Sequence, residues 1–277
     1  MSRIVRAACV QITATPDVAA NLAMIEPMLA EARKNGAQLI ALPENCTALG
    51  AHVVGQAPRP ADPEAEGAMP FFAAQAKKLD AWILAGSLTV RRDDGKNYNR
   101  SCLFGPQGDV AAHYDKIHLF DAVLASGEQY RESEKVAPGG RAVLADTPLA
   151  KIGMTICYDL RFGHLYRDLA KAGAEIIAVP AAFTVPTGQA HWHVLLRARA
   201  IETGCYILAP GQCGTHEANR KTFGHSLIVD PWGAIIAEAG DNPAIIYADL
   251  DLDEVARVRQ MLPSLKHDRD YAGVSGG

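Results

Sequence analysis

The sequence predicts a layered α/β protein, and three observations support that fold class. Short β-type runs alternate with helical patterns along the 277 residues, and 49% of the chain is hydrophobic, enough for a sizeable core. The third observation is a repeated unit, because residues 36–43 closely resemble residues 173–180. Each copy follows a helical pattern, begins with a glycine suited to a left-handed cap and continues as an apolar strand that ends at proline. The repeat suggests two related halves, although such units also recur in unrelated α/β proteins.

The elements follow in order from residue patterns. The first strand is expected close to Met1, at residues 3–12, because this stretch has no polar lead-in and no cleavage signature of a signal peptide. Amphipathic spacing predicts helices at 18–35, 64–79, 163–172, 189–203 and 251–260. Apolar and β-branched runs predict the other strands at 37–42, 81–90, 99–105, 141–147, 151–156, 174–179, 205–213, 223–230, 234–238 and 244–250.

Two features interrupt these patterns. Pro27 lies inside the first helical pattern and should kink or split it, because proline lacks the N–H group that a helix interior requires. Residues 50–63 are rich in Pro, Ala and Gly, which is typical of a surface loop. Since no long Pro, Gly or Ser tract marks a linker, we expect one domain over residues 1–277.

Composition excludes several classes of function. The 27 basic and 31 acidic residues are mixed along the chain, so no basic block indicates nucleic-acid binding. No stretch approaches the roughly 18 apolar residues of a membrane span. The cysteines at 9, 46, 102, 157, 205 and 213 form no C-x-x-C motif, so neither a disulfide framework nor a zinc ribbon is expected. Free thiols indicate a reducing compartment, and we predict a cytoplasmic protein.

Cys157 is the first candidate catalytic residue. It follows the strand at 151–156 and opens a turn into the helix at 163–172, where backbone N–H groups and the helix dipole can stabilise a thiolate. Such an environment lowers a thiol pKa from about 8.5. Cysteines at strand ends more often serve packing, which suits the apolar surroundings of most others in this chain. The polar residues 158–161 set Cys157 apart.

Glu44 and Lys116 are weaker candidates when taken singly. Glu44 follows the buried strand that ends at Pro43, and a carboxylate at a dry sheet edge tends to have a raised pKa, which suits acid–base chemistry. Lys116 is an isolated cation among apolar and aromatic neighbours. Alone, Glu44 could be a surface turn residue and Lys116 a lysine whose head reaches solvent.

Three segments together carry a specific resemblance. LPEN (42–45), YDKIHLF (114–120) and ICYDLRF (156–162) resemble, in order and spacing, the nitrilase superfamily of carbon–nitrogen hydrolases, over about residues 3–260. The resemblance implies a four-layer α–β–β–α sandwich, a catalytic Glu44–Lys116–Cys157 triad, no metal or cofactor, and homodimers or larger homo-oligomers. It also implies a second glutamate, matched to Glu132 with Glu128 as the alternative, and a C-terminal helix and tail (251–277) at a subunit interface.

These roles define a mechanism. Glu44 would accept the Cys157 proton, and the thiolate would attack a carbonyl carbon. Lys116 and the backbone N–H of Tyr158 would stabilise the tetrahedral oxyanion, and Glu132 would hold Lys116 or Glu44 in place. Glu44 would then protonate the amine and activate the water that hydrolyses the thioester.

Further segments resemble the amidase branch, and among its members the deaminated glutathione amidases. They are residues 180–184, 187–192, 195–203, 212–216, 224–226 and 229–233. The resemblance implies a small carboxylated amide as substrate and a pocket that includes Tyr158, Arg161, Phe183, Thr184, His191, Trp192 and Arg199. The two arginines could clamp substrate carboxylates, or could instead pair with Asp159 and Glu202. His193 departs from the group, which tends to carry Glu at that position.

Other functions remain to be weighed. An ω-amidase acting on 2-oxoglutaramate is the main alternative, and a true nitrilase would attack a C≡N group with the same residues. A papain-like enzyme would need a histidine base. A metal hydrolase would need clustered ligands, and His191-x-His193 is the only close histidine pair in the sequence. A non-catalytic scaffold would not need all three triad residues.

Overall fold

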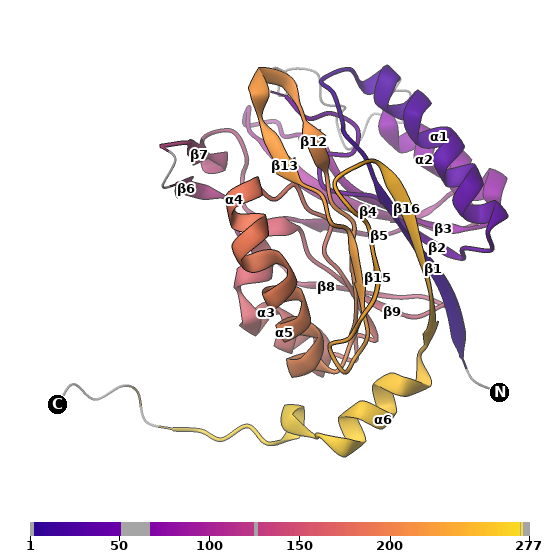
Figure 1. The fold of residues 1–277 in the computed structure, drawn as a ribbon, viewed down its shortest axis with the longest axis vertical. Coiled ribbons are helices and arrows are strands. Elements are labelled where there is room, and N and C mark those ends of the chain that lie inside the picture. Colours follow the sequence, from indigo (N-terminus) through magenta and orange to yellow (C-terminus); the bar gives the residue numbers. More distant parts are fainter. Residues whose placement is uncertain (1–2, 51–66, 125–126, 272, 274–277) are drawn as a thin grey trace.

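Two six-stranded mixed sheets lie face to face, and helices cover the outer face of each (Figure 1). The computed structural model describes residues 3–50, 67–124, 127–271 and 273. The first sheet has the order β16 (Ala244–Asp251), β1 (Ile4–Gln11), β2 (Leu39–Ala41), β3 (Trp82–Arg91), β4 (Asn97–Phe104) and β5 (Val110–Asp115). The second has the order β15 (Ile235–Glu238), β14 (Leu227–Val229), β11 (Tyr206–Ala209), β10 (Ile176–Ala178), β9 (Lys151–Met154) and β8 (Val143–Asp146).

The helices complete the predicted four-layer α–β–β–α sandwich. α1 (Val18–Lys34) and α2 (Ala68–Leu79) cover the first sheet, whereas α3 (Gly163–Lys171) and α5 (His193–Thr203) cover the second (Figure 1). Strand β1 shows why two layers form: Ala8 and Val10 belong to the core beneath α1 and α2, and Ala7 and Cys9 to the core shared with the second sheet. Alternate residues of a strand point to opposite faces, so both faces of this sheet are buried.

The repeated sequence unit occupies equivalent places in the two sheets. Each sheet contains three parallel strands, β1–β2–β3 and β9–β10–β11, with antiparallel strands on either side. β2 and β10, which come from the two copies, are the central strands of these triplets. Gly36 and Gly173 precede them with φ values of 87° and 102°, the left-handed conformation expected of both. The arrangement agrees with two related halves.

Several expected elements have different boundaries. The predicted strand 205–213 is divided into β11 and β12 (Cys213–Thr215) at Pro210, and 223–230 into β13 (Lys221–Phe223) and β14 at residues 224–226. The helix expected at 189–203 begins with a short α4 (Val185–Thr187) and a π-helical turn (Gly188–Trp192) before α5. Three strands were not predicted: β5, β6 (Asp121–Val123) and β7 (Gln129–Arg131). They are short or largely exposed, so their apolar periodicity is weak.

Two local expectations can also be compared with the structure. Helix α1 continues through Pro27, so of the two predicted outcomes, a kink or a split, the split is wrong. Pro27 and Ala23 are both exposed, and the Ala23 carbonyl that loses its helical partner can bind water instead. Apart from Gly50, the loop expected at 50–63 lies outside the described residues.

The chain ends in α6 (Asp253–Met261), a 3-10 turn (Ser264–Lys266) and a polar tail. The tail extends from the body beneath α3 and α5 in Figure 1, and Arg167 and Lys171 of α3 form ion pairs with Asp268. Among the described residues, no helix combines the length and the apolar character needed to cross a membrane.

Candidate active site

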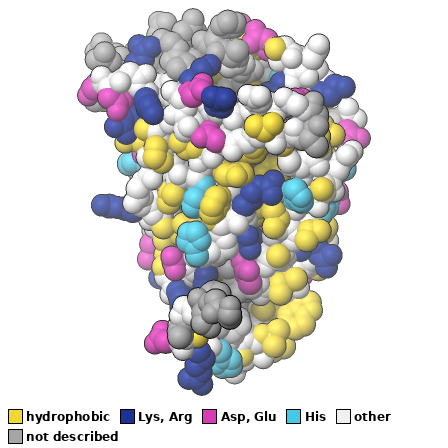
Figure 2. Space-filling model, turned by 90° about the vertical axis from the view of Figure 1, so that its left-hand side faces the viewer, with side chains coloured by type: hydrophobic (Ala, Val, Ile, Leu, Met, Phe, Trp, Pro, Cys, Tyr) yellow, Lys and Arg dark blue, Asp and Glu magenta, His cyan; other side chains and the backbone are white. Residues whose placement is uncertain are grey.

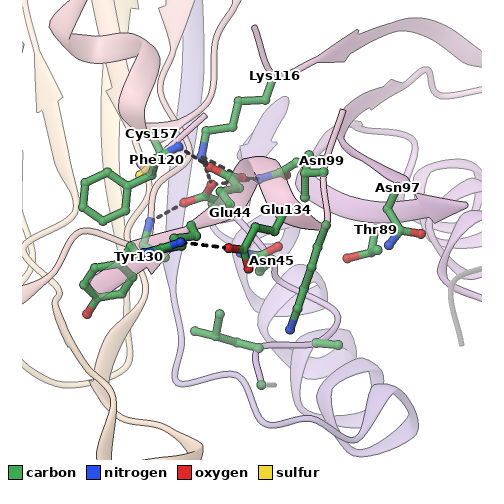
Figure 3. Close-up of a pocket in the computed structure, with 18 of the residues that line it drawn as sticks. Glu44, Asn45, Thr89, Asn97, Asn99, Lys116, Phe120, Tyr130, Glu134 and Cys157 are labelled. Carbon is green, nitrogen blue, oxygen red and sulfur yellow. Dashed lines mark hydrogen bonds and ion pairs between the residues drawn. The ribbon is translucent and has the colours of Figure 1, made fainter. Parts of the chain in front are cut away.

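Four of the predicted residues meet in one cavity of about 590 Å³ (Figure 3). Glu44 follows β2, Lys116 follows β5, Glu132 opens a 3-10 turn after β7, and Cys157 follows β9. Sheets of this kind bring the carboxyl ends of their strands to one edge, which is where ligands usually bind. The fold therefore assembles one site from segments that are more than a hundred residues apart.

Lys116 lies between two carboxylates. Its Nζ is 2.8 Å from Glu44 Oε1 and 2.8 Å from Glu132 Oε2. Lys116 and Glu44 are only 2% and 4% exposed, so these charges have little access to water. Burial alone would lower the pKa of Lys116, but Glu132 and Glu44 outweigh it and raise that pKa well above its ordinary value. The ammonium is held charged.

Neutral groups fix the same two carboxylates. Asn99 Nδ2 donates to Glu44 Oε1 at 2.9 Å and to Glu132 Oε1 at 3.1 Å. Backbone N–H groups complete the set, from Ala182 to Glu44 Oε2 at 3.0 Å and from Phe120 to Glu132 Oε2 at 2.7 Å. Asn99 was not predicted, because only the fold brings β4 beside both glutamates.

Of the two glutamates considered in the sequence, Glu132 lies beside Lys116 and Glu128 does not. Glu132 contacts Lys116 and lines the cavity, whereas Glu128 is exposed and lies outside its lining. The short strand β7 separates the two residues, and only the one that follows it, Glu132, reaches Lys116.

Cys157 occupies a constrained turn. Its φ is +48°, a left-handed conformation that is unfavourable for a residue with a Cβ, and its N–H donates to Pro180 O at 2.9 Å. Cys157 is the first residue of a 3-10 helix (Cys157–Arg161), and the next residue, Tyr158, lies in the first turn, where N–H groups lack helical acceptors. Such strain is typical of functional turns that aim one side chain.

Two expected pKa shifts are corrected by these surroundings. Burial and the neighbouring Glu44 raise the pKa of the Cys157 thiol well above its ordinary value, although Lys116 acts in the opposite direction. Burial alone would raise the pKa of Glu44, but the charge and hydrogen bond of Lys116 lower it overall. The resting pair is therefore a neutral thiol beside a carboxylate. That arrangement still suits a base, because the carboxylate is ready to accept the thiol proton.

A buried carboxylate links the Cys157 turn to the Lys116 segment. Asp159 Oδ2 accepts hydrogen bonds from Ile156 N at 2.9 Å and from Tyr114 Oη at 2.8 Å. Asp159 Oδ1 accepts from His118 N at 3.0 Å and lies 2.7 Å from His118 Nδ1. Tyr114 and His118 flank Lys116, so Asp159 fixes the nucleophile turn relative to the cation. In the sequence, the polar residues 158–161 had set this turn apart. The contacts of Asp159 with Tyr114 and His118 could not be predicted.

A second, narrower cavity is also lined by Cys157. Phe120, Cys157 and Ala182 line both cavities, and the narrower one is completed by Tyr158, Arg161, Phe183, Thr184 and Thr187. The Arg161 guanidinium lies 3.3 Å from His191 Nδ1 and above the rings of Tyr158 and Phe183. Predicted pocket residues Tyr158, Arg161, Phe183 and Thr184 are thus brought together, and His191 contacts this group through Arg161.

Two other predicted pocket residues lie elsewhere. Trp192 is 1% exposed, packs on Phe183 and donates from Nε1 to His225 O at 2.7 Å, so it supports the cavity wall from behind. Arg199 donates from Nε to Leu160 O at 2.9 Å and forms an ion pair with Glu202 at 2.8 Å, as the alternative interpretation of that arginine expected. Neither lines a cavity that contains Cys157. Arg220, which was not predicted, lines the larger one.

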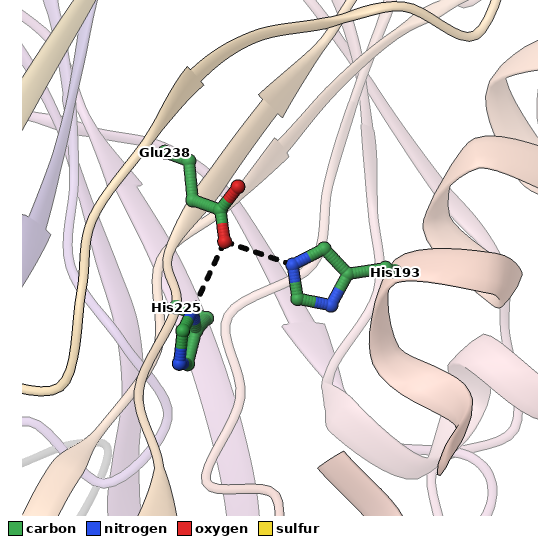
Figure 4. A group of neighbouring side chains, drawn as sticks. All are labelled: His193, His225 and Glu238. Atoms are coloured by element: carbon green, nitrogen blue, oxygen red, sulfur yellow. Dashed lines mark hydrogen bonds and ion pairs between the residues drawn. The ribbon is translucent and has the colours of Figure 1, made fainter. Parts of the chain in front are cut away.

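One group of histidines and a carboxylate could hold a metal ion within the described ranges (Figure 4). His193 Nε2 and His225 Nδ1 lie 2.9 and 3.0 Å from the same oxygen of Glu238. The close sequence pair, His191-x-His193, is not the pair that the fold brings together. The three side chains lie outside both cavities that contain Cys157. Glu238 Oε1 already contacts both rings, and His225 Nε2 lies 3.1 Å from Asp241 Oδ1.

Comparisons with known proteins agree with this geometry. The family model described as "Carbon-nitrogen hydrolase" matches residues 6–260. The chain is 41% identical to a deaminated glutathione amidase of Synechocystis, over 94% of this chain and 97% of that protein. It is 33% identical to an omega-amidase of Bos taurus, over 95% of each chain. The solved structure of Saccharomyces cerevisiae Nit3, a nitrilase superfamily member, is similar with a TM-score of 0.85 and 31% identity, over 96% of this chain and 97% of that one.

Proposed function

The chain belongs to the carbon–nitrogen hydrolase family, and on that premise we propose a cysteine amidohydrolase with Cys157 as nucleophile. The observation that supports it best is the buried Glu44–Lys116–Glu132 network beside the Cys157 thiol. Two carboxylates and one cation provide a base, an oxyanion stabiliser and a positioning group in one cavity. Neither a papain-like enzyme nor a metal hydrolase would use all four residues.

The proposed reaction begins with the neutral Cys157 thiol beside the Glu44 carboxylate. Glu44 removes the Cys157 proton as sulfur attacks the amide carbon, and the carbonyl electrons move to oxygen. Lys116 Nζ and the Tyr158 N–H stabilise that oxyanion. When the tetrahedral intermediate collapses, the C–N bond breaks, Glu44 gives its proton to the departing amine, and a thioester remains. Glu44 then takes a proton from water, whose oxygen attacks the thioester. The C–S bond breaks, the acid is released, and Glu44 returns its proton to the Cys157 sulfur.

Glu132 is proposed as a positioning residue. With Glu44 alone, the buried Lys116 ammonium would be drawn toward the base and away from the developing oxyanion. The second carboxylate, anchored by Phe120 N–H, holds the ammonium from another side. It also leaves the network with one excess negative charge, so that Lys116 remains protonated when Glu44 takes a proton.

The proposed substrate is a small carboxylated amide, deaminated glutathione, cleaved to 2-oxoglutarate and cysteinylglycine. The similarity to a deaminated glutathione amidase supports it, and so does Arg161, a cation beside Cys157 that has no carboxylate partner among the described residues. An ω-amidase that uses 2-oxoglutaramate is the alternative, and the 33% identity to such an enzyme is the observation in its favour.

The deciding experiment compares the two compounds on one preparation. We expect the specificity constant kcat/KM to be higher for deaminated glutathione, with Cys157→Ala inactive on both. If 2-oxoglutaramate is preferred by more than about tenfold, some 1.4 kcal/mol of transition-state discrimination, the substrate proposal is wrong and the ω-amidase alternative stands. A matched nitrile that is turned over faster than its amide would instead indicate a true nitrilase.

The cellular and quaternary setting is also proposed. All six cysteines are free thiols, which supports a reducing, cytoplasmic location. Pairing of β1 with β16 joins the two ends of the chain in one sheet and supports a single domain over residues 1–277.

Self-association is supported by exposed apolar side chains. The face that carries α3 and α5 shows apolar side chains between charged ones (Figure 2), and Val194, Ile201 and Trp232 are all exposed. In the C-terminal segment, Met261 and Leu262 are exposed as well. We propose that these surfaces and the tail pack in a homodimer or larger homo-oligomer. Light scattering that detects only monomer at micromolar concentration contradicts this.

A further inference from the structure

Arg220 lines the larger cavity and has one unsatisfied buried donor. Its Nε is buried, with no hydrogen-bond partner among the described residues, and no ion pair of its guanidinium is found in that part of the chain. The other arginine of this cavity, Arg131, is paired with Glu134, and Lys116 is held by two carboxylates. A buried donor without an acceptor is costly, and it calls for a ligand or a functional reason.

The backbone around Arg220 is fixed in place. Arg220 follows a 3-10 turn between β12 and β13, in which Ala218 and Asn219 have φ values of 55° and 59°. The Arg220 carbonyl accepts from His216 N at 2.7 Å, and the His216 ring is held by Ala14 O and by Thr222 Oγ1. Its guanidinium lies over the Tyr130 ring, 5.8 Å from the centroid. The donor is therefore preorganised, which reduces the entropy lost on binding.

The two cavities have different roles if Cys157 and Glu44 act as proposed. Cys157 lines both, so the scissile carbonyl lies where they meet. Glu44 lines only the larger one, and it must reach the nitrogen of the departing amine. The leaving group consequently enters the larger cavity with Arg220, and the acyl chain enters the narrower one with Arg161.

We propose that Arg220 binds a carboxylate at the far end of the leaving amine and so selects amides with an anionic, dipeptide-like leaving group. The inference rests on the proposed function and identifies what that site recognises on its leaving-group side. A guanidinium can bind a carboxylate through two parallel hydrogen bonds, and the Arg220 guanidinium lines the cavity without an ion-pair partner in the described part of the chain. An amide that releases ammonia has no group that could reach Arg220.

The experiment pairs a change in the protein with a change in the substrate. Deaminated glutathione and its analogue with the terminal carboxylate converted to a carboxamide are compared on the wild type, Arg220→Met and Arg131→Met. We expect the wild type to prefer the acid by about 10- to 100-fold in kcat/KM, and Arg220→Met to reduce that preference below about threefold. Arg131→Met removes the same charge from the same cavity, yet its side chain is exposed and paired, so it should keep the preference.

The informative quantity is the ratio of kcat/KM for deaminated glutathione to kcat/KM for its carboxamide analogue. The charge of Arg220 also helps to lower the pKa of Glu44, so Arg220→Met will change absolute rates on every substrate. Turnover of 2-oxoglutaramate by each variant separates loss of folding from loss of the subsite. Arg220→Lys, which keeps the charge but not the paired geometry, should give an intermediate preference.

Three results would overturn the assignment: an unchanged preference in Arg220→Met, no preference in the wild type, or an equal loss in Arg131→Met. A wild type that hydrolyses 2-oxoglutaramate but neither form of deaminated glutathione is a different outcome. It refutes the proposed substrate first, and the leaving-group subsite with it.

Discussion

Replacing Lys116 by methionine tests the charge network most directly. The change keeps a long side chain but removes the ammonium that lies 2.8 Å from one oxygen of each glutamate. Glu44 and Glu132 then remain close together and share the amide of Asn99 without a cation between them. Because Glu44 is buried, it should take up a proton rather than stay charged. Lys116 is the main group that lowers the pKa of Glu44, so without it that pKa should rise and the base should be lost.

Two separate magnitudes follow. Removal of one oxyanion donor lowers kcat by about 10²–10³, or roughly 2.7–4 kcal/mol. Removal of one partner from a buried ion pair destabilises a protein by about 3–5 kcal/mol, less whatever protonation of Glu44 recovers. We therefore expect kcat to fall at least a hundredfold and the free energy of unfolding to fall by a few kcal/mol.

Steady-state kinetics and urea unfolding measure these two effects. Lys135→Met is the matched control, because Lys135 lines the same cavity but is exposed, and both quantities should stay near wild type. In Lys116→Met combined with Glu132→Gln, one excess negative charge is removed. Stability should recover in part, whereas turnover should remain low.

Either of two results would refute the reasoning. A folded Lys116→Met enzyme with near-normal turnover would exclude the oxyanion role. Recovery of turnover together with stability in the double variant would show that Lys116 serves only to neutralise the two carboxylates.

Three further predictions concern the thiol, metal ions and pH. Iodoacetamide should label Cys157 before the other cysteines, since Cys157 is 8% exposed and lines the cavity whereas the other five are fully buried; prior labelling of Cys46 or Cys213 would contradict its assignment. Dialysis against EDTA should leave the rate unchanged, and an enzyme that loses activity and regains it with zinc would implicate the His193–His225–Glu238 group. The lowered pKa of Glu44 contributes stability that is present above its ordinary value of about 4.5 and is lost as the pH falls through the folded-state pKa. Urea unfolding should thus show that the free energy of unfolding falls as the pH is lowered below about 4.5. In a Glu44→Gln variant this fall should be smaller.

The fold class was predictable because it depends on periodicity. Apolar runs and the repeated glycine–strand–proline unit indicate buried parallel strands, and their carboxyl ends indicate where Glu44 and Cys157 lie. Lys116 differs, since it follows β5, an exposed strand with little apolar signal, and only the resemblance of its segment identified it. Strand register decides the remaining contacts. Asn99 and Asp159 contact residues that lie 55 and 41 positions away in the sequence, and no local pattern encodes those distances.

The pocket residues were harder to predict because one segment contributes both side chains that line the cavity and side chains that are buried behind it. Residues 183–203 pass from the cavity surface at Phe183 to the core at Trp192 and then to the buried face of α5 at Arg199. Their order along the chain does not say which side chain reaches the cavity. The π-helical turn between α4 and α5 changes the helical phase, so extrapolation along the predicted helix fails after residue 188.

The two halves of the molecule supply complementary parts of the site. Glu44, Lys116 and Glu132 follow strands of the first half, whereas Cys157 and the Ala182 N–H follow β9 and β10 of the second sheet. Ala182 N–H and the Asp159 side chain are hydrogen-bonded across this boundary, to Glu44 and to the Lys116 segment. A change that separates the sheets by a fraction of an ångström would therefore misalign the base and the nucleophile without removing either. It follows that Asp159→Asn, which touches neither substrate nor thiol, should lower kcat more than it raises KM. Equal changes in both constants would instead indicate that substrate binding is what Asp159 supports.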